Sequence, residues 1–172
     1  MRLENSIGKS KLKMKFSSQE EYGLRCLLRI ARESNGRGLT IPEISKAEGI
    51  SEAHVAKLLR ILRLNGYLES SRGQVGGYSL KQNPENIKVN EVLTLLGGKL
   101  YDEEFCGQHF IAKDLCTNSV ECSIRSLWQM LQGAVDGVLN NLTVADLISP
   151  AEELVSKIQL ADKKFIEIAN LS

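Results

Sequence analysis

Two short helical patterns joined by a tight glycine turn constrain the fold of this chain more than any other feature. The first pattern begins at Thr40 and Glu43, whose spacing is that of a capping box, and it ends at Gly49. Ser51 stands where it can cap a second helix two residues later. Apolar residues then recur at helical spacing in one stripe: Val55, Leu58, Leu59 and Leu62. We therefore expect two short helices separated by a sharp turn.

A glycine-rich segment follows these helices at once. Strand candidates at residues 67–71 and 78–80 flank the sequence Arg72-Gly73-Gln74-Val75-Gly76-Gly77. Three glycines in six residues are typical of a hairpin tip, since glycine adopts backbone conformations that other residues avoid. A helix pair followed by a hairpin is the order of a winged helix-turn-helix domain. Helix pairs alone also occur in unrelated helical domains, so the hairpin carries much of this prediction.

A winged helix-turn-helix domain presents the N-terminal residues of its second helix to the major groove of DNA. The candidate contacts here are Ser51, Glu52, Ala53, His54 and Lys57. The hairpin would add a cation and close backbone approach through Arg72, Gly73, Gly76 and Gly77. Structural interpretations stay open: Glu52 suits any helix N-terminus, His54 can be a packing residue, and Lys57 can be a solvated charge.

Charge is distributed unevenly along the chain. Residues 1–82 hold fifteen Lys and Arg against eight Asp and Glu, whereas residues 83–172 hold seven against thirteen. A basic half favours a polyanion as the partner of that half. Most of the excess lies before residue 38, so charge alone does not separate a nucleic-acid surface from an ordinary one.

Two further helices are expected in this first part of the chain. One begins near Ser18, where Ser17 and Glu20, or Ser18 and Glu21, have capping-box spacing, and it ends before residues 35–36. Cys26 falls in the middle of this helix and is expected in the core. A short helix is predicted at residues 90–96.

The longest apolar stripe spans residues 123–142. It consists of Ile124, Leu127, Trp128, Leu131, Val135, Val138, Leu139 and Leu142. One helix of that length would measure about 30 Å and would need a partner for its apolar face. A second copy of the chain is the most economical partner, so we expect a homodimer. Thr143 with Asp146 predicts one more helix start, and a last helix is expected at roughly 150–170.

Three cysteines lie close together in a segment without helical or strand periodicity, at residues 99–122. They are Cys106, Cys116 and Cys122. In a chain without a secretory signal, clustered cysteines favour metal binding or redox chemistry over disulfides. Thiolates are the standard ligands of iron–sulfur clusters, whereas structural zinc usually takes closely spaced cysteine pairs that are missing here. A thiol–disulfide switch and incidental cysteines remain alternatives.

Five segments of the chain resemble the Rrf family of IscR- and NsrR-type regulators. They are Phe16-Ser17-Ser18, Glu21-Tyr22-Gly23-Leu24-Arg25, Ile50-Ser51-Glu52-Ala53-His54-Val55, the hairpin from Arg72 to Tyr78, and Thr143-Val144-Ala145-Asp146-Leu147. The resemblance covers about residues 14–148. It implies a mostly α-helical winged-helix regulator with a small β-hairpin and a long dimerisation helix. Many members carry an iron–sulfur cluster between the DNA-binding domain and that helix.

The resemblance also implies a ligand set for such a cluster, either 2Fe–2S or 4Fe–4S. The three loop cysteines would be ligands. Nine and five residues separate them here, whereas the gaps in the family are usually shorter and nearly equal. IscR-like members have a histidine where this chain has Arg125. NsrR-like members use an acidic residue of the other subunit, and the aligned position here is Glu21. Glu21 of the partner subunit is therefore our preferred fourth ligand, and His109 is the alternative ligand. Glu21 can also have a purely structural role as a cap of its own helix.

These features predict a cytoplasmic regulator, a repressor, that binds double-stranded operator DNA as a homodimer. It would sense redox state, nitric oxide or iron–sulfur status. The alternatives are a cluster-free regulator with a thiol redox switch and an iron–sulfur electron carrier. An enzyme is not expected, because the chain lacks P-loop, dinucleotide, zinc-protease and nucleophile-elbow motifs. No apolar run is long enough to span a membrane.

The expected organisation has five parts along the chain. They are a flexible basic extension (1–13), the winged-helix domain (14–98), a cluster-binding cysteine loop (99–122), the dimerisation helix with its following turn (123–148), and a C-terminal helix (149–172).

Overall fold

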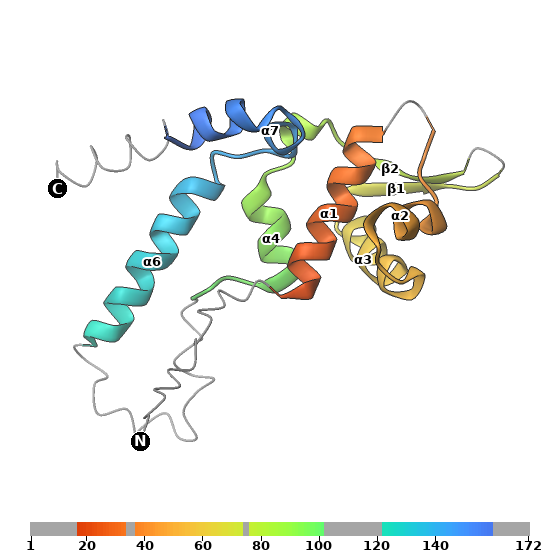
Figure 1. The fold of residues 1–172 in the computed structure, drawn as a ribbon. Helices are drawn as coiled ribbons and strands as arrows, with labels where there is room; N and C mark the ends of the chain where they lie inside the picture. Colours follow the sequence, from red (N-terminus) through yellow and green to blue (C-terminus); the bar gives the residue numbers. More distant parts are fainter. Residues whose placement is uncertain (1–16, 34–36, 74–75, 102–121, 160–172) are drawn as a thin grey trace, which may run out of the picture.

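The computed structural model describes residues 17–33, 37–73, 76–101 and 122–159 (Figure 1). The elements follow in the order α1 (Ser18–Glu33), α2 (Ile41–Glu48), α3 (Glu52–Leu64), β1 (Leu68–Ser71), β2 (Gly77–Leu80), the 3-10 turn η1 (Pro84–Asn86), α4 (Val89–Gly97), α6 (Ser123–Leu139) and α7 (Val144–Ile148). Helical residues 151–159 come last. The chain is mostly helical with one antiparallel hairpin, which confirms the predicted fold class. The predicted extension 1–13 and residues 102–121 of the cysteine loop lie outside the described residues.

Helix starts are set by reciprocal hydrogen bonds between a hydroxyl residue and an acid three positions later. At α1 the pair is Ser17 and Glu20, and the Ser17 backbone N–H donates to Glu20 Oε2 at 2.8 Å. Thr40 with Glu43 forms the same capping box at α2, and Thr143 forms it at α7. Ser51 occupies the N-cap of α3, but its hydroxyl makes no capping hydrogen bond, so that part of the prediction is wrong.

The core lies where α1 packs against α3, α4 and α7. Its fully buried members come from α1 to α4 and from the segment around α7, and they include Cys26, Leu27, Ile30, Ile44, Val55, Leu58, Leu59, Leu62, Ile87, Val92 and Val144. Each fully buried aliphatic side chain contributes about 1.5–3 kcal/mol relative to an exposed one. The predicted apolar stripe of α3 is thus confirmed as the face that packs into the core.

The hairpin is anchored to the core by a backbone approach at two glycines. Strand β2 pairs with β1 and also with Leu39, whose N–H donates to the Tyr78 carbonyl at 2.9 Å. Gly77 faces Gly38 so closely that a Cβ on Gly77 would lie 2.5 Å from the Gly38 carbonyl carbon. A side chain at Gly77 would therefore push the hairpin away from the domain.

Helix α6 is shorter than its apolar stripe predicted. It ends at Leu139 instead of residue 142, and Asn140 occupies its C-cap. Leu142 is buried, and its carbonyl accepts the Val89 N–H at 3.0 Å, while Val144 N–H donates to the Ile87 carbonyl at 2.9 Å. The end of the predicted stripe therefore serves the domain core and not a partner. Of the predicted last helix at 150–170, helical structure is described for residues 151–159.

Among the described helices, none combines the length and apolar character needed to cross a membrane.

Candidate functional site

The solvent face of α3 carries the polar residues that the sequence singled out. Ser51, Glu52, Ala53 and Lys57 are all exposed, while the opposite face of the helix is buried. Figure 1 shows α2 and α3 side by side on one side of α1, with the β1–β2 hairpin extending beyond them. This placement leaves the N-terminal part of α3 open to a large partner.

Two cations on α3 were not among the sequence-derived candidates. Arg60 and Arg63 are exposed on the same helix, three and six residues after Lys57. They follow Lys57 at intervals of three residues, which keeps neighbouring side chains on one side of a helix. The sequence signal was present, because both arginines fall between the apolar positions of the stripe, but the prediction considered the first two turns alone.

His54 packs against the first helix and is partly buried. Its ring meets the Tyr22 ring edge-on, with 5.5 Å between centroids and an interplanar angle of 80°. Such edge-to-face pairs stabilise packing by about 0.5–1.5 kcal/mol beyond area burial. The Arg25 guanidinium lies 5.8 Å from the centroid of the same Tyr22 ring. His54 thus holds the N-terminal part of α3 on α1, which is the packing role that the sequence left open.

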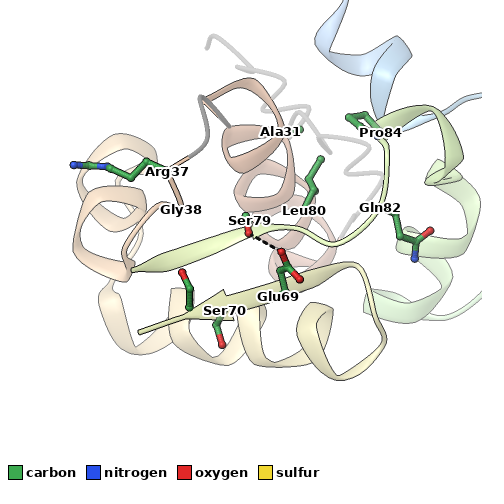
Figure 2. A pocket seen from close by; sticks show the side chains of 10 residues that line it. Ala31, Arg37, Gly38, Glu69, Ser70, Ser79, Leu80, Gln82 and Pro84 are labelled. Carbon is green, nitrogen blue, oxygen red and sulfur yellow. Dashed lines mark hydrogen bonds between the residues drawn. The ribbon is translucent and has the colours of Figure 1, made fainter. Parts of the chain in front are cut away.

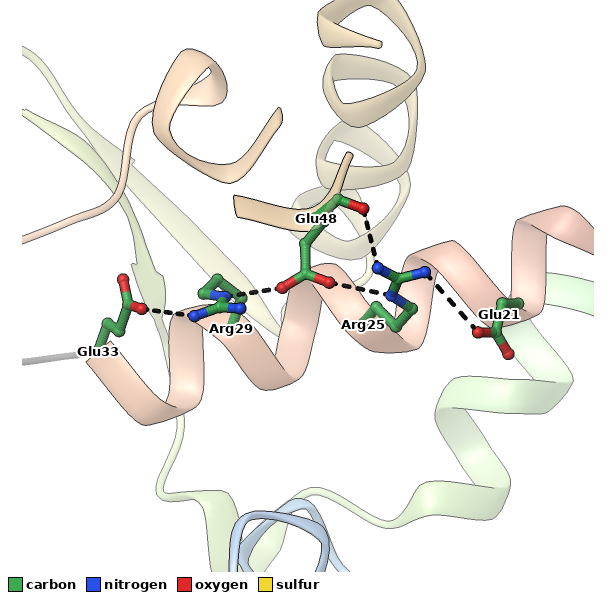
Figure 3. Close-up of polar contacts among 5 residues, drawn as sticks. All are labelled: Glu21, Arg25, Arg29, Glu33 and Glu48. Carbon is green, nitrogen blue, oxygen red and sulfur yellow. Dashed lines mark hydrogen bonds and ion pairs between the residues drawn. The ribbon is translucent and has the colours of Figure 1, made fainter. Parts of the chain in front are cut away.

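An ion cluster fixes the end of α2 on α1 (Figure 3). Glu48, the last residue of α2, accepts hydrogen bonds from the Nε atoms of Arg25 and Arg29, at 2.9 and 2.7 Å. Burial disfavours the Glu48 carboxylate, but the hydrogen bonds from Arg29 and Arg25 outweigh that effect and lower the pKa of Glu48. Arg29 also pairs with Glu33 at 2.7 Å. The helix-turn-helix is therefore held by charge as well as by its apolar core.

The hairpin tip presents an exposed cation beside exposed backbone. Arg72 and Gly73 are exposed, and Gly73 has a φ of 113°, which favours glycine at that position. The Gly76 N–H donates to the Gly73 carbonyl at 2.9 Å and closes the turn. Gln74 and Val75 of the predicted tip lie outside the described residues. Gly77 has the structural task already described, against Gly38.

Of the three cysteines predicted to bind a metal cluster, the described residues include Cys122. Cys122 is a free, half-buried thiol at the N-cap of α6, and its Sγ accepts the Arg125 backbone N–H at 3.4 Å. The sulfur is half-exposed at the start of α6, a position open to a metal ion. Cys106, Cys116 and His109 lie outside the described residues. Within residues 17–33, 37–73, 76–101 and 122–159, no three potential metal ligands come together.

The two other residues that bear on this site behave differently from each other. Glu21 is exposed on the first turn of α1, and its carboxylate lies 4.0 Å from Arg25 Nη1, so it is accessible to a partner. Cys26 is fully buried, as predicted, and burial raises the pKa of its thiol to about 11, with a smaller contribution from Glu48. Glu21 has the accessibility that a ligand needs, whereas Cys26 belongs to the core.

Helix α6 exposes a large part of its apolar stripe. The exposed side chains of the stripe are Ile124, Leu127, Trp128 and Leu131, and Met130 is exposed outside the stripe. Their exposed fractions lie between 41 and 70%, although these residues are among the largest apolar ones in the chain. Large exposed apolar patches are typical of protein–protein interfaces, so this side of α6 is a candidate for one.

An open pocket of about 620 Å³ lies between the C-terminal end of α1 and the hairpin (Figure 2). Ser79 and Glu69 line it and form a hydrogen bond of 3.4 Å, with Ser79 Oγ as donor. Arg37 also lines the pocket but is paired with Glu43. The lining thus offers an exposed acid and hydroxyls, a chemistry that does not suit the phosphates of DNA.

Comparison with known proteins agrees with this geometry. Residues 16–150 match a family described as "Rrf2: Iron-dependent Transcriptional regulator". The HTH-type transcriptional regulator IscR of Serratia proteamaculans is 31% identical over 142 residues, which are 83% of this chain and 84% of that protein. Protein rrf2 of Nitratidesulfovibrio vulgaris is 33% identical over 138 residues, covering 80% of this chain and 89% of its relative.

A solved structure shows the same fold. CymR, described as the global cysteine regulator of B. subtilis, superposes with a TM-score of 0.64 at 26% identity. The match covers 79% of this chain and 97% of CymR. The winged-helix arrangement deduced from residue patterns is therefore shared with an experimentally solved regulator.

Proposed function

Since this chain belongs to the Rrf2 family of transcriptional regulators, we propose that it is a homodimer that binds operator DNA and represses transcription until a signal acts on its cysteines. Its homologues are DNA-binding regulators of transcription and not enzymes. The proposal concerns the residues that contact DNA, the dimer and the sensing chemistry.

The observation that carries the DNA-binding part is the open N-terminal face of α3 beside the hairpin. Ser51, Glu52 and Lys57 are exposed there, on a helix whose other face is locked in the core. Hydroxyl and carboxylate groups at the start of such a helix can hydrogen-bond base edges in the major groove. Ala53 leaves room for close approach and offers an apolar contact to a thymine methyl group.

Phosphate contacts would come from the cations that flank this face. Lys57, Arg60 and Arg63 follow one another on the exposed side of α3, and Arg72 extends from the hairpin. Contacts to phosphates position a protein on the duplex and make its affinity depend on salt. Gly73 and Gly76 would let the hairpin backbone approach the sugar–phosphate chain.

The dimer would form through α6. Its exposed apolar residues, centred on Leu127, Trp128 and Leu131, need a cover that the described part of one chain does not supply. A second copy offers the same surface, and a two-fold arrangement is the commonest way to bury such a face. Two recognition helices about 34 Å apart would then reach successive major grooves of a pseudo-palindromic operator.

Selection from a random duplex library with the wild-type protein tests the DNA-binding part. We expect enrichment of a two-fold symmetric sequence and affinity that falls steeply between 50 and 200 mM salt, as expected for about six or more phosphate contacts. Fluorescence anisotropy with the enriched duplex and a scrambled one measures both. Equal affinity for the two duplexes at every salt concentration would rule out sequence-specific regulation.

For the sensing site, we propose an iron–sulfur cluster held by Cys106, Cys116 and Cys122. The fourth ligand would be Glu21 of the partner subunit, with His109 as the alternative. Two observations support this choice: the family is described as iron-dependent, and the Cys122 thiol is half-exposed at the N-cap of α6. When bound, the cluster would supply a centre that reacts with oxidants or nitric oxide.

A cluster-free thiol switch is the second candidate. It is favoured by the structural likeness to CymR of Staphylococcus aureus, which has been solved in a form described as oxidized (TM-score 0.63, 25% identity). In that case Cys122 would form a disulfide or a sulfenic acid instead of binding iron. The two candidates predict different metal contents for the same purified protein.

Anaerobic purification distinguishes them. A cluster predicts a brown protein with visible absorbance, iron and acid-labile sulfide, and Cys122→Ser should lose most of the iron. Cys26→Ala is the matched control, because Cys26 is buried in the core and should leave the iron content unchanged. A colourless wild-type protein without iron, whose DNA affinity changes on oxidation, would establish the thiol switch instead.

A further inference from the structure

A polar cluster joins α6 to the rest of the domain. It consists of Asn90 on α4, the backbone of Tyr101, Gln132 and Asp136 on α6, and Asn140 at the C-cap of α6. We refer to these five residues as the polar clasp. It lies where α4 and α6 approach each other, away from α3 and the hairpin (Figure 1).

The side-chain amide of Gln132 lies at the centre of the polar clasp and forms hydrogen bonds through both its oxygen and its nitrogen. The Tyr101 backbone N–H donates to Gln132 Oε1 at 3.0 Å, and Gln132 Nε2 donates to Asp136 Oδ1 at 2.9 Å. Since one partner is a donor and the other an acceptor, a single orientation of the Gln132 amide satisfies both. Asn90 Nδ2 reaches across from α4 and donates to Asp136 Oδ1 at 3.0 Å.

The second bond of Asn90 extends the clasp by one turn of α6. Asn90 Nδ2 also donates to Asn140 Oδ1 at 2.7 Å. Asn90 therefore contacts Asp136 in the last turn of α6 and the C-cap Asn140 four positions later, a spacing that lies along one face of a helix. Contacts along a face resist a change in helix angle better than a single contact does.

Apolar packing holds α6 on the domain only in part, because the apolar side chains within residues 135–139 are half-buried. Gln132 is the one buried residue on the described α6, while Leu127 and Leu131 of the apolar stripe remain exposed. The directional hydrogen bonds of the polar clasp therefore help to set the direction of α6 relative to α4, together with this partial apolar packing.

The angle of α6 has a consequence for DNA recognition if the proposed dimer is correct. Each subunit's α3 would be placed relative to the two-fold axis by the path from α3 through α1 and α4 to α6. We infer that the polar clasp sets the separation of the two recognition helices, and that Gln132 is a positioning residue for operator half-site spacing. This inference rests on the proposed function.

Gln132→Met tests the inference, because methionine has a similar length but cannot replace either hydrogen bond. The matched control is Gln129→Met on the same helix, where the side chain is exposed. The probes are the duplex selected with wild-type protein, its isolated half-site, and versions with the spacer one or two base pairs longer or shorter. Each added base pair moves a half-site by about 3.4 Å and rotates it by about 35°.

We expect wild type and Gln129→Met to lose about tenfold or more in affinity when the spacer changes by one base pair. Gln132→Met should lose about threefold or less, with unchanged half-site affinity and unchanged dimer mass by light scattering. A loss of spacing preference without a loss of half-site affinity is a result that general destabilisation does not produce. Gln132→Met with the wild-type spacing profile would overturn the inference.

If thermal melting shows that Gln132→Met is unfolded, Asn90→Ala repeats the test from the other helix. It removes both hydrogen bonds from α4 and should relax the spacing preference in the same way. If wild type enriches a spaced duplex and Asn90→Ala keeps the same preference, the inference alone fails. If wild type enriches no duplex, the proposed function fails and the inference with it.

Discussion

The Arg25 guanidinium donates two hydrogen bonds to Glu48, one to its carboxylate and one to its backbone carbonyl. Arg25 Nε donates to Glu48 Oε2 at 2.9 Å, and Arg25 Nη2 donates to the Glu48 backbone carbonyl at 2.8 Å. The carbonyl of the last residue of α2 is one of the groups that a helix C-terminus leaves without an internal partner. Gly49 follows at once with a left-handed φ of 67°, so Arg25 fixes the point from which the chain turns into α3.

Glu48→Gln should destabilise the domain by about 2–3 kcal/mol. The substitution keeps the shape of the side chain but leaves two arginines without their shared carboxylate, which is 9% exposed. Urea unfolding followed by circular dichroism measures the effect. Glu33→Gln is the matched control, because Glu33 pairs with the same Arg29 at an exposed position and should cost less than about 1 kcal/mol. Equal losses in the two variants would contradict the importance of the buried cluster.

The contribution of Glu48 should disappear in acid. Its pKa is lowered in the folded protein, so its stabilising effect is fully present above the unfolded value of about 4.3 and is lost as pH falls through the folded value. The difference in unfolding free energy between wild type and Glu48→Gln should therefore be constant from pH 6 to 8 and shrink below about pH 4. Urea titrations across this range measure it. A difference that persists unchanged at pH 3 would show that the carboxylate charge is not its source.

Cys26 and Cys122 should differ sharply in reactivity. A rise in pKa from 9.0 to about 11 lowers the thiolate fraction of Cys26 at pH 8 by roughly a hundredfold, and burial blocks access as well. We expect iodoacetamide to alkylate Cys122 in the folded, metal-free protein within minutes while Cys26 stays unmodified. Peptide mass spectrometry locates the label, and guanidinium-unfolded protein serves as the control in which both react. Alkylation of Cys26 at a similar rate in the folded protein would contradict its place in the core.

Local sequence patterns predicted the elements near the DNA-binding face well. The capping box at Thr40 and the helix end at Gly49 depend on a few neighbouring residues, and both are confirmed. The apolar stripe of α3 is also confirmed as buried. Patterns of this kind are legible because the physical interactions join residues three or four positions apart.

Long-range pairings explain what the sequence did not reveal. Glu48 lies 23 residues from Arg25 and 19 from Arg29, so no local pattern links them. Leu142 has the spacing of the α6 stripe, yet the backbone pairing of Lys88 with Thr143 draws it into the core and ends the helix earlier. Tertiary contacts outweighed periodicity there.

Leu131→Glu should weaken the proposed dimer without unfolding the domain. The side chain is 45% exposed in one chain, so a charge is tolerated there until a second copy must cover it. We expect a loss of about 2 kcal/mol, or roughly 30-fold in the dimer dissociation constant, by sedimentation or light scattering. Gln129→Glu, away from the apolar face by its helical position, should change it little. Undiminished dimerisation of Leu131→Glu would place the interface elsewhere.

Arg72→Ala separates two ways in which the hairpin can contact DNA. If the guanidinium binds a base edge, affinity for the selected duplex should fall by about 1–3 kcal/mol while affinity for scrambled DNA changes little. If it binds phosphate, both affinities should fall together and the slope of log affinity against log salt should flatten by about 1.

Lys99→Ala is the control for the loss of one positive charge, because Lys99 is exposed beyond the end of α4. It should leave the salt slope and both affinities near the wild-type values. Anisotropy titrations at several salt concentrations distinguish all these outcomes. Since Gly77 holds the hairpin against Gly38, Arg72 is carried on a rigid base, and its removal should not move the rest of the interface. If Arg72→Ala behaves as Lys99→Ala does, the hairpin does not contact DNA through this residue.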